Sequence, residues 1–275
     1  MSVGSGEFFV VKMRRPPRST PFPDPTPVRS AAPALGGATA GVAADAPSPP
    51  GVHNIVIVPG AFVDGSGWRV VHDILSHKGY HVTVVQPRIE SLPDDVDQLA
   101  DRIRKQDGPT ILVGHSYGGM VITQAGARDK VKGLVYVSAL VPEVGETLSQ
   151  LLGSMPSPSN DVAPTREGRL YIAEAKFADD VAADLTKNRT DFMAISQVPG
   201  TTKAFGATTQ IAAWHDKPVW AIVSTQDHAL SPDLQRWMYQ RAHAQVTEIA
   251  GSHVTYISQP EKVAAVIEEA ARSAK

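Results

Sequence analysis

From Val52 onward, short apolar segments alternate with longer segments that repeat apolar residues at helical spacing. The first short segment, Asn54–Val58, is a run of mostly β-branched residues that reads as a buried strand. Strands are also predicted at His81–Val85, Thr110–Val113, Leu134–Leu140, Pro218–Ser224 and Val246–Ile249. Amphipathic helices are predicted between them, and a last helix is predicted from Pro260. This alternation predicts an α/β fold, with a mostly parallel twisted sheet and helices on both faces.

One block interrupts the alternation. Pro142 to about His215 shows no convincing strand, and helical pieces are predicted at Arg169–Phe177, Asp179–Leu185 and Asp191–Gln197. An insertion of this length between two core strands is too long for a simple loop, and such insertions are usually functional lids. We therefore predict a small helical cap over residues 142–215.

The first fifty residues differ from the rest, because they hold ten of the 22 prolines of the chain, and Val28–Pro50 has no periodic apolar face. We predict that residues 1–50 are disordered or artefactual and that 51–275 form the folded domain. Lys12–Ser30 resembles translated vector or sequencing-adapter sequence. Ala31–Ala46 fits either a signal-peptide remnant, which would imply export to the periplasm or medium, or a flexible linker. The compartment, exported or cytoplasmic, therefore stays open.

Composition narrows the class of function. The chain has no cysteine, which excludes disulfides, a thiol nucleophile and a cysteine-ligated metal. The net charge of −2, without a stripe of basic residues, does not suggest a nucleic-acid partner. No uninterrupted apolar run approaches the length of a membrane span. Either a monomer or a homodimer is compatible with these properties.

The residues Gly114 to Gly118 form a G-x-S-x-G motif between a predicted strand and a predicted helix. A sharp turn at this junction would raise the hydroxyl of Ser116 above the sheet edge, and the glycines avoid clashes within the turn. The position at a helix N-terminus also favours developing negative charge. We predict that Ser116 is a nucleophile. The alternative is a glycine-rich turn with an ordinary exposed serine.

A serine hydroxyl needs a base, and the base needs an orienting acid. His253 follows the last predicted strand, and Asp227 follows the strand Pro218–Ser224. Both therefore lie at the carboxyl ends of strands, where the ligand sites of open α/β sheets occur. We predict His253 as base and Asp227 as orienting acid. His115, inside the motif, is expected to be buried and to point away from Ser116.

An oxyanion needs hydrogen-bond donors. The backbone N–H of Tyr117, directly after the nucleophile, is one predicted donor. The second is expected from the loop after the first strand, with Ala61 ahead of Phe62. The substrate pocket is predicted to be apolar. Its candidate residues are Phe62, Val63, Trp68, Tyr117, Leu140, Phe192, Met193, Leu230 and Val254. Each of them is also explained by a core position, and the helical spacing of Trp68 favours the core for that residue.

Together these segments resemble the α/β-hydrolase fold. The resemblance rests on Val58–Trp68 (VPGAFVDGSGW), Gly114–Gly119 (GHSYGG), Asp227 and Gly251–His253 (GSH), and it covers roughly Val52 to Ala274. Within that fold the chain is similar to the small-cap group of bacterial carboxylesterases, pyrethroid hydrolase-like enzymes, plant methylesterases and hydroxynitrile lyases. One departure is Pro59-Gly60, where the family usually has His-Gly. The proline removes an N–H, which affects the setting of the oxyanion loop.

The resemblance implies hydrolysis of a small-molecule ester through an acyl-enzyme, without a metal or organic cofactor. One alternative is a hydroxynitrile lyase, which in this family uses a threonine where this chain has Gly60, and a lysine from the cap. Lys176, Lys187 and Lys203 are the cap lysines, and each is also explained by a solvated helix face. A second alternative is a non-catalytic receptor on the same fold.

Overall fold

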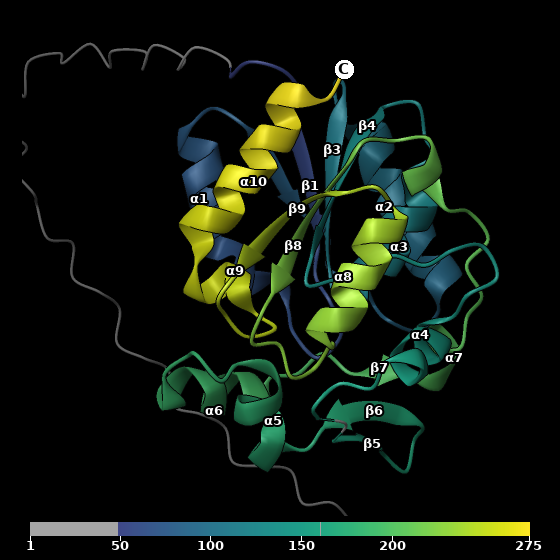
Figure 1. Cartoon of the computed structure of the whole chain (residues 1–275), viewed down its shortest axis with the longest axis vertical. Coiled ribbons are helices and arrows are strands. Elements are labelled where there is room, and N and C mark those ends of the chain that lie inside the picture. The colour runs from purple at the N-terminus through teal and green to yellow at the C-terminus, as the bar shows by residue number, and fades with distance from the viewer. Residues whose placement is uncertain (1–48, 160) are drawn as a thin grey trace, which may run out of the picture. The chain divides into compact units, whose positions relative to one another are not determined.

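The computed structural model describes residues 49–159 and 161–275 (Figure 1), so almost all of the predicted N-terminal segment lies outside the described residues. Six strands form one sheet, and every neighbouring pair is parallel. In spatial order they are β2 (His81–Val84), β1 (Asn54–Val58), β3 (Thr110–His115), β4 (Val131–Val137), β8 (Val219–Ser224) and β9 (Gln245–Ile249). The predicted fold class is confirmed. The fourth strand begins and ends three residues earlier than predicted.

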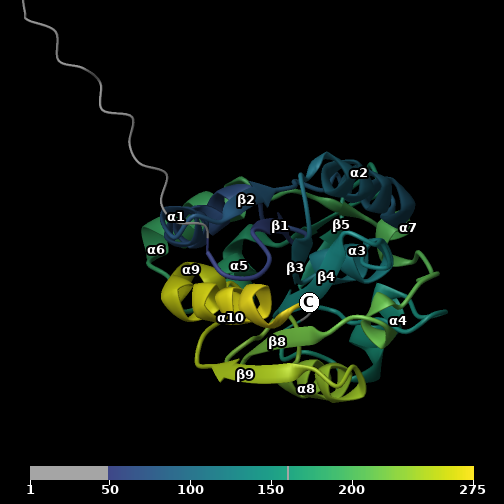
Figure 2. The same ribbon diagram turned by 90° about the horizontal axis from the view of Figure 1, so that it is seen from above.

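Helices cover both faces of the sheet, as Figure 2 shows from above. One face packs against α1 (Arg69–His77) and α10 (Pro260–Ser273), and the other against α2 (Leu92–Lys105), α3 (Gly118–Ala125) and α8 (Pro232–Arg241). Every residue of β1, β3 and β8 is consequently buried. Two apolar cores result, one on each face. None of the helices within the described residues is long and apolar enough to cross a membrane.

Local sequence explains where these helices begin. Ser91 caps α2 by accepting a hydrogen bond from the N–H of Asp94 at 3.3 Å. Pro232 and Pro260 occupy first-turn positions of α8 and α10, where the missing N–H costs nothing. Before α1, the short 3₁₀ helix η1 (Gly65–Trp68) is capped by Asp64, whose carboxylate accepts the N–H of Ser66 at 2.8 Å.

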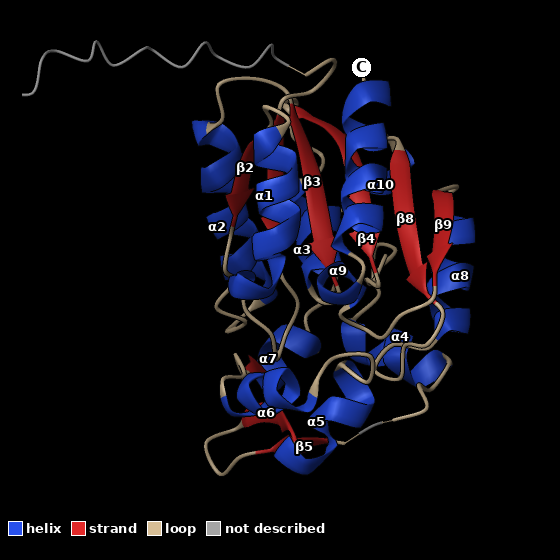
Figure 3. Ribbon diagram, turned by 90° about the vertical axis from the view of Figure 1, so that its left-hand side faces the viewer, coloured by secondary structure: helices blue, strands red, loops and turns tan. Residues whose placement is uncertain are grey.

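The insertion between β4 and β8 forms a cap at the carboxyl ends of the strands (Figure 3). Its helices are α4 (Leu148–Ser154), α5 (Glu174–Val181), α6 (Lys187–Ile195) and α7 (Thr202–Phe205), followed by the 3₁₀ helix η2 (Ala213–His215). It also contains a three-stranded antiparallel sheet of β5 (Val162–Pro164), β6 (Arg169–Ile172) and β7 (Gly200–Thr201).

The prediction that the cap lacks strands is therefore wrong. The helix expected from Arg169 starts only at Glu174, because the preceding residues pair as β6. Burial alternates along Arg169–Ile172, which is the period of a strand, but a four-residue run is too short to be distinguished by periodicity. The short helix α9 (Thr255–Ser258), which follows His253, was not predicted either.

Candidate active site

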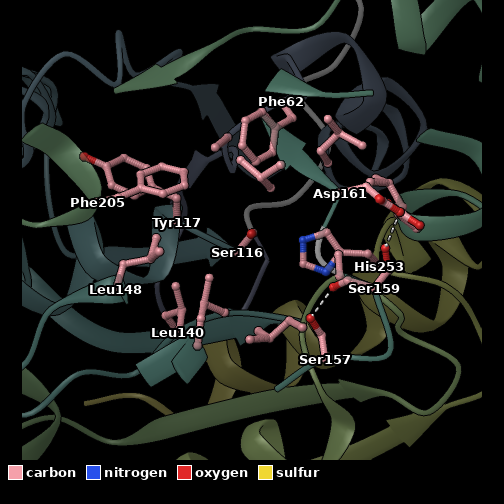
Figure 4. Close-up of a pocket in the computed structure, with 18 of the residues that line it drawn as sticks. Phe62, Ser116, Tyr117, Leu140, Leu148, Ser157, Ser159, Asp161, Phe205 and His253 are labelled. Atoms are coloured by element: carbon pink, nitrogen blue, oxygen red, sulfur yellow. Dashed lines mark hydrogen bonds between the residues drawn. The ribbon is translucent and has the colours of Figure 1, made fainter. Parts of the chain in front are cut away.

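Three strands bring the predicted triad to one edge of the sheet. Ser116 directly follows β3, Asp227 follows β8, and His253 follows β9. Because β3, β4, β8 and β9 are consecutive neighbours and parallel, their carboxyl ends share one edge. Figure 4 shows Ser116 next to His253 among the residues that line one cavity.

The turn at Ser116 is strained and closely packed. Ser116 has a φ of 51°, which is uncommon for a residue other than glycine. A Cβ added to Gly118 would lie 2.2 Å from the carbonyl oxygen of Val58, so this position accepts only glycine without a backbone shift. The N–H of Ser116 donates to the carbonyl of Ser138 at 3.2 Å, which ties the turn to the end of β4. The fold thus holds the serine side chain away from the strand and toward the cavity.

Asp227 and His253 form a buried pair. His253 Nδ1 lies 2.7 Å from Asp227 Oδ2, and the two residues are 5% and 1% exposed. Asp227 Oδ1 accepts the N–H groups of Ala229 and Leu230 at 2.9 and 2.8 Å. Asp227 Oδ2 also accepts the side-chain amide of Gln235 at 2.8 Å. Since every partner is a donor, the carboxylate fixes the proton on Nδ1 and leaves the Nε2 lone pair for the serine side.

His115 packs against His253 and contacts its backbone. Its Nε2 lies 3.0 Å from the carbonyl oxygen of His253, and the two ring centroids are 4.6 Å apart. Burial, and then the nearby His253, lower the pKa of His115 well below its ordinary value, so this ring is neutral. Ser116 Oγ and His253 do not meet hydrogen-bond geometry in the described part of the chain. Contacts of this kind often tighten only when substrate binds.

The predicted oxyanion donors divide into two groups. The N–H groups of Ala61 and Tyr117 donate no hydrogen bond within residues 49–159 and 161–275. The N–H of Phe62 instead donates to the carbonyl oxygen of Val198 in the cap, at 2.8 Å. The prediction of Phe62 as an oxyanion donor is therefore wrong, because its N–H is already bound. Its side chain lines the cavity, and its φ of 66° is uncommon for a residue other than glycine.

The cavity beside Ser116 has a volume of about 450 Å³. Phe62, Tyr117, Leu140 and Leu230 line it, as predicted from the sequence. Cap residues that were not predicted complete the wall, and they include Leu148, Leu152, Val162, Ile172, Val181 and Phe205. Near Ser116, Phe205 stacks against Tyr117, with ring centroids 6.0 Å apart and planes at 24°.

Five predicted pocket residues do not line this cavity. Val63, Phe192 and Met193 line a separate cavity of about 140 Å³, and the Phe192 residue is 63% exposed. Trp68 is fully buried and stacks on Tyr256 at 4.2 Å, so it belongs to the core. Val254 is also fully buried, although it directly follows His253. Position along the chain does not show which way these side chains point.

Three further polar residues support the site and were not predicted. Gln235, fully buried on α8, bridges Asp227 to the carbonyl of Leu230 at 2.8 Å. Asp184 in the cap accepts both the hydroxyl of Ser252 at 2.6 Å and the N–H of Ser252 at 3.1 Å. A polar residue on an otherwise apolar helix face is the one sequence signal that could have identified Gln235.

The third residue is Asp95 on α2, which accepts the hydroxyl of Tyr117 at 2.8 Å. Burial raises the pKa of Asp95, and the hydrogen bonds from Tyr117, Arg88 and Ile89 partly offset this. The hydrogen bond from Tyr117 to Asp95 fixes the side chain of Tyr117, the residue next to Ser116. Within the described residues, no group of three or more histidine or acidic side chains could hold a metal ion.

Comparison with known proteins identifies the family. Residues 55–266 match the model of the alpha/beta hydrolase family. The chain is 28% identical over 247 residues to an alpha/beta hydrolase of Aspergillus novofumigatus, which covers 80% of this chain and 97% of that protein. It is 25% identical over 253 residues to a pyrethroid hydrolase of Sphingobium wenxiniae, covering 78% and 86%. A carbendazim-hydrolysing esterase of Nocardioides is 39% identical over 114 residues, which are 36% of this chain and 47% of the esterase.

A crystal structure of a pyrethroid hydrolase from Sphingobium faniae has the same fold, with a TM-score of 0.66 and 23% identity. The match covers 81% of this chain and 98% of that one. The chain therefore belongs to the alpha/beta hydrolase family and is an enzyme of the hydrolase class. The resemblance predicted from the motifs is confirmed.

Proposed function

We propose that this enzyme is a serine carboxylesterase in which Ser116, His253 and Asp227 form the catalytic triad. His253 Nε2 removes the proton from Ser116 Oγ as the oxygen attacks the ester carbonyl. The resulting oxyanion accepts hydrogen bonds from the N–H groups of Ala61 and Tyr117. The protonated His253 then gives its proton to the leaving alcohol, and an acyl-enzyme remains. Water, activated by the same histidine, releases the acid and restores the serine.

The observation that carries this proposal is the buried Asp227–His253 pair beside a strained serine. The carboxylate, at 2.7 Å from Nδ1, favours the ring tautomer that can accept the serine proton. The free N–H groups of Ala61 and Tyr117 supply donors where negative charge would develop. The esterase and hydrolase names of the relatives agree with this chemistry.

The lyase alternative finds less support at the same site. A Cβ added to Gly60 would lie 2.6 Å from the Cβ of Ser116, so the threonine of the lyases does not fit on this backbone. Within the described residues, the cavity wall contains no lysine that could serve as the lyase cation. Both features favour the hydrolase.

The proposal is tested with p-nitrophenyl acetate, butyrate and octanoate. The parent is expected to hydrolyse these esters, and Ser116→Ala to lose at least about 10³-fold in kcat. Ser154→Ala is the matched control, because Ser154 is exposed and does not line the cavity. Equal turnover by the parent and Ser116→Ala would refute the nucleophile. No turnover by the parent would favour the lyase or receptor alternatives.

A further inference from the structure

The cavity beside Ser116 has two chemically different ends. Figure 4 shows Tyr117, Phe205 and Leu148 on one side of the serine, and Ser157, Ser159 and Asp161 on the other, next to His253. The first end is aromatic and aliphatic, with Phe62 edge-on to Phe205 at 6.0 Å. Since Ser116 lies between the ends, a bound ester would place one half of its structure in each.

The polar end presents hydrogen-bond acceptors. Ser157 donates its hydroxyl to the carbonyl of Ser159 at 2.6 Å, and Ser159 Oγ donates to Asp161 Oδ2 at 3.3 Å. Because both serine hydroxyl groups already donate their protons within the protein, their oxygen atoms can only accept hydrogen bonds from a molecule in the cavity. The N–H of Ser159 donates to the carbonyl of His228 at 3.2 Å, which holds this wall beside the loop that follows Asp227.

The charge of this end is negative. Asp161 and Asp180 both line the cavity, and among the described residues neither lysine nor arginine does. Asp180 lies at the same end as Asp161, because Ser159 and Asp161 are among the groups that shift its pKa. Lys176 lies 3.9 Å from Asp161 and offsets part of one charge. Asp180 is only 7% exposed and forms no ion pair within the described residues. Burial raises the pKa of Asp180, so a cation bound beside it would stabilise its charged form.

The mechanism decides which half of the ester meets the acids. The general acid must reach the leaving oxygen, so the alcohol leaves on the side of His253. In Figure 4 that side is the polar end. The acyl group then occupies the aromatic end beside Tyr117 and Phe205. This step rests on the proposed function, because it assigns to His253 the protonation of the alcohol.

We infer that the preferred substrates join an apolar acyl group to an alcohol that carries a protonated amine. Asp161 and Asp180 recognise the ammonium group, and Phe62, Phe205 and Leu148 enclose the acyl chain. An alcohol that carries a carboxylate is repelled by the same two acids. The selectivity therefore resides in the cap, which supplies both acids.

The test compares three butanoate esters of similar size. 2-(Dimethylamino)ethyl butanoate is cationic at pH 7, 3-methylbutyl butanoate is its neutral isostere, and 3-butanoyloxypropanoate is anionic. kcat/KM is measured by acid release for the parent and for the double variant Asp161→Asn/Asp180→Asn. An ester that is not turned over is scored as a competitive inhibitor of p-nitrophenyl butyrate hydrolysis. The cation-to-neutral ratio of the parent divided by that of the variant cancels the intrinsic reactivity of the esters.

We expect this double ratio to be roughly tenfold, which corresponds to about 1.4 kcal/mol. The anionic ester should gain in the double variant. The control Asp179→Asn, at an exposed neighbour that does not line the cavity, should give a ratio near one. A double ratio within about twofold of one would overturn the inference while leaving the esterase intact. Absence of p-nitrophenyl butyrate hydrolysis by the parent would instead remove the proposed function and this inference with it.

Discussion

Replacing Asp227 by asparagine should abolish most activity by changing a tautomer. All four groups that Asp227 contacts are donors: the N–H groups of Ala229 and Leu230, the amide of Gln235 and His253 Nδ1. The two backbone donors cannot change, so the asparagine carbonyl must face them. Its NH₂ group then faces His253, which can accept only if its proton moves to Nε2. A histidine protonated at Nε2 cannot take the proton of Ser116.

The expected loss in kcat for Asp227→Asn is about 10⁴-fold, or about 5.4 kcal/mol of barrier. KM should change little, because Asp227 does not line the cavity. The new donor-to-donor contact with Gln235 should also lower the free energy of unfolding by about 1–3 kcal/mol. The assay is p-nitrophenyl butyrate kinetics together with urea unfolding. Asp233→Asn is the control, since its side chain is 83% exposed on α8. A folded Asp227→Asn protein that keeps more than a tenth of the parental kcat would refute this reasoning.

Three further predictions concern the supports of the site. Asp184→Ala removes two hydrogen bonds to the loop that carries His253 and should lower kcat roughly 3- to 30-fold in steady-state kinetics; an unchanged kcat would show that the cap does not position this loop. Because burial lowers the pKa of His115 below 6.5, its contribution to stability is complete above that pH and is lost as the pH falls. The free energy of unfolding, measured with urea, should therefore fall more steeply between pH 7 and pH 5 for the parent than for His115→Gln. The same dependence on pH in both proteins would contradict this. Gly118→Ala places a Cβ 2.2 Å from Val58 O and should cost about 3 kcal/mol or more, measured as a fall in Tm; an unchanged Tm would show that the turn can adjust.

The frame of the molecule could be predicted from the sequence because it depends on strong local signals. Buried strands such as Asn54–Val58 are continuous β-branched runs, and helices such as Pro260–Ser273 repeat apolar residues at helical spacing. The edge that holds Ser116, Asp227 and His253 follows from the same pattern, because parallel strands end on one side. The roles assigned to these residues stay predictions until they are measured.

The cap and the pocket could not be predicted in the same way. The strand Val162–Pro164 is short and exposed along its length, so it carries no periodic signal. Its pairing with Arg169–Ile172 is visible only in three dimensions. Trp68 was among the pocket candidates, although its helical spacing favoured a core position, and its stacking on Tyr256 places it in the core. The N–H of Phe62 is not available as an oxyanion donor, because it donates to the carbonyl oxygen of Val198, a residue far away in the sequence.

The central claim is that Ser116 carries the acyl group, and covalent labelling tests it most directly. The parent is incubated with an organophosphate ester, which phosphorylates an activated serine, and its peptides are mapped by mass spectrometry. We predict one adduct, on the peptide that contains Ser116, formed in the parent and in Ser154→Ala and absent from Ser116→Ala. An adduct that persists in Ser116→Ala, or that lies on Ser157 or Ser159 in the cavity wall, would contradict the assignment of the nucleophile.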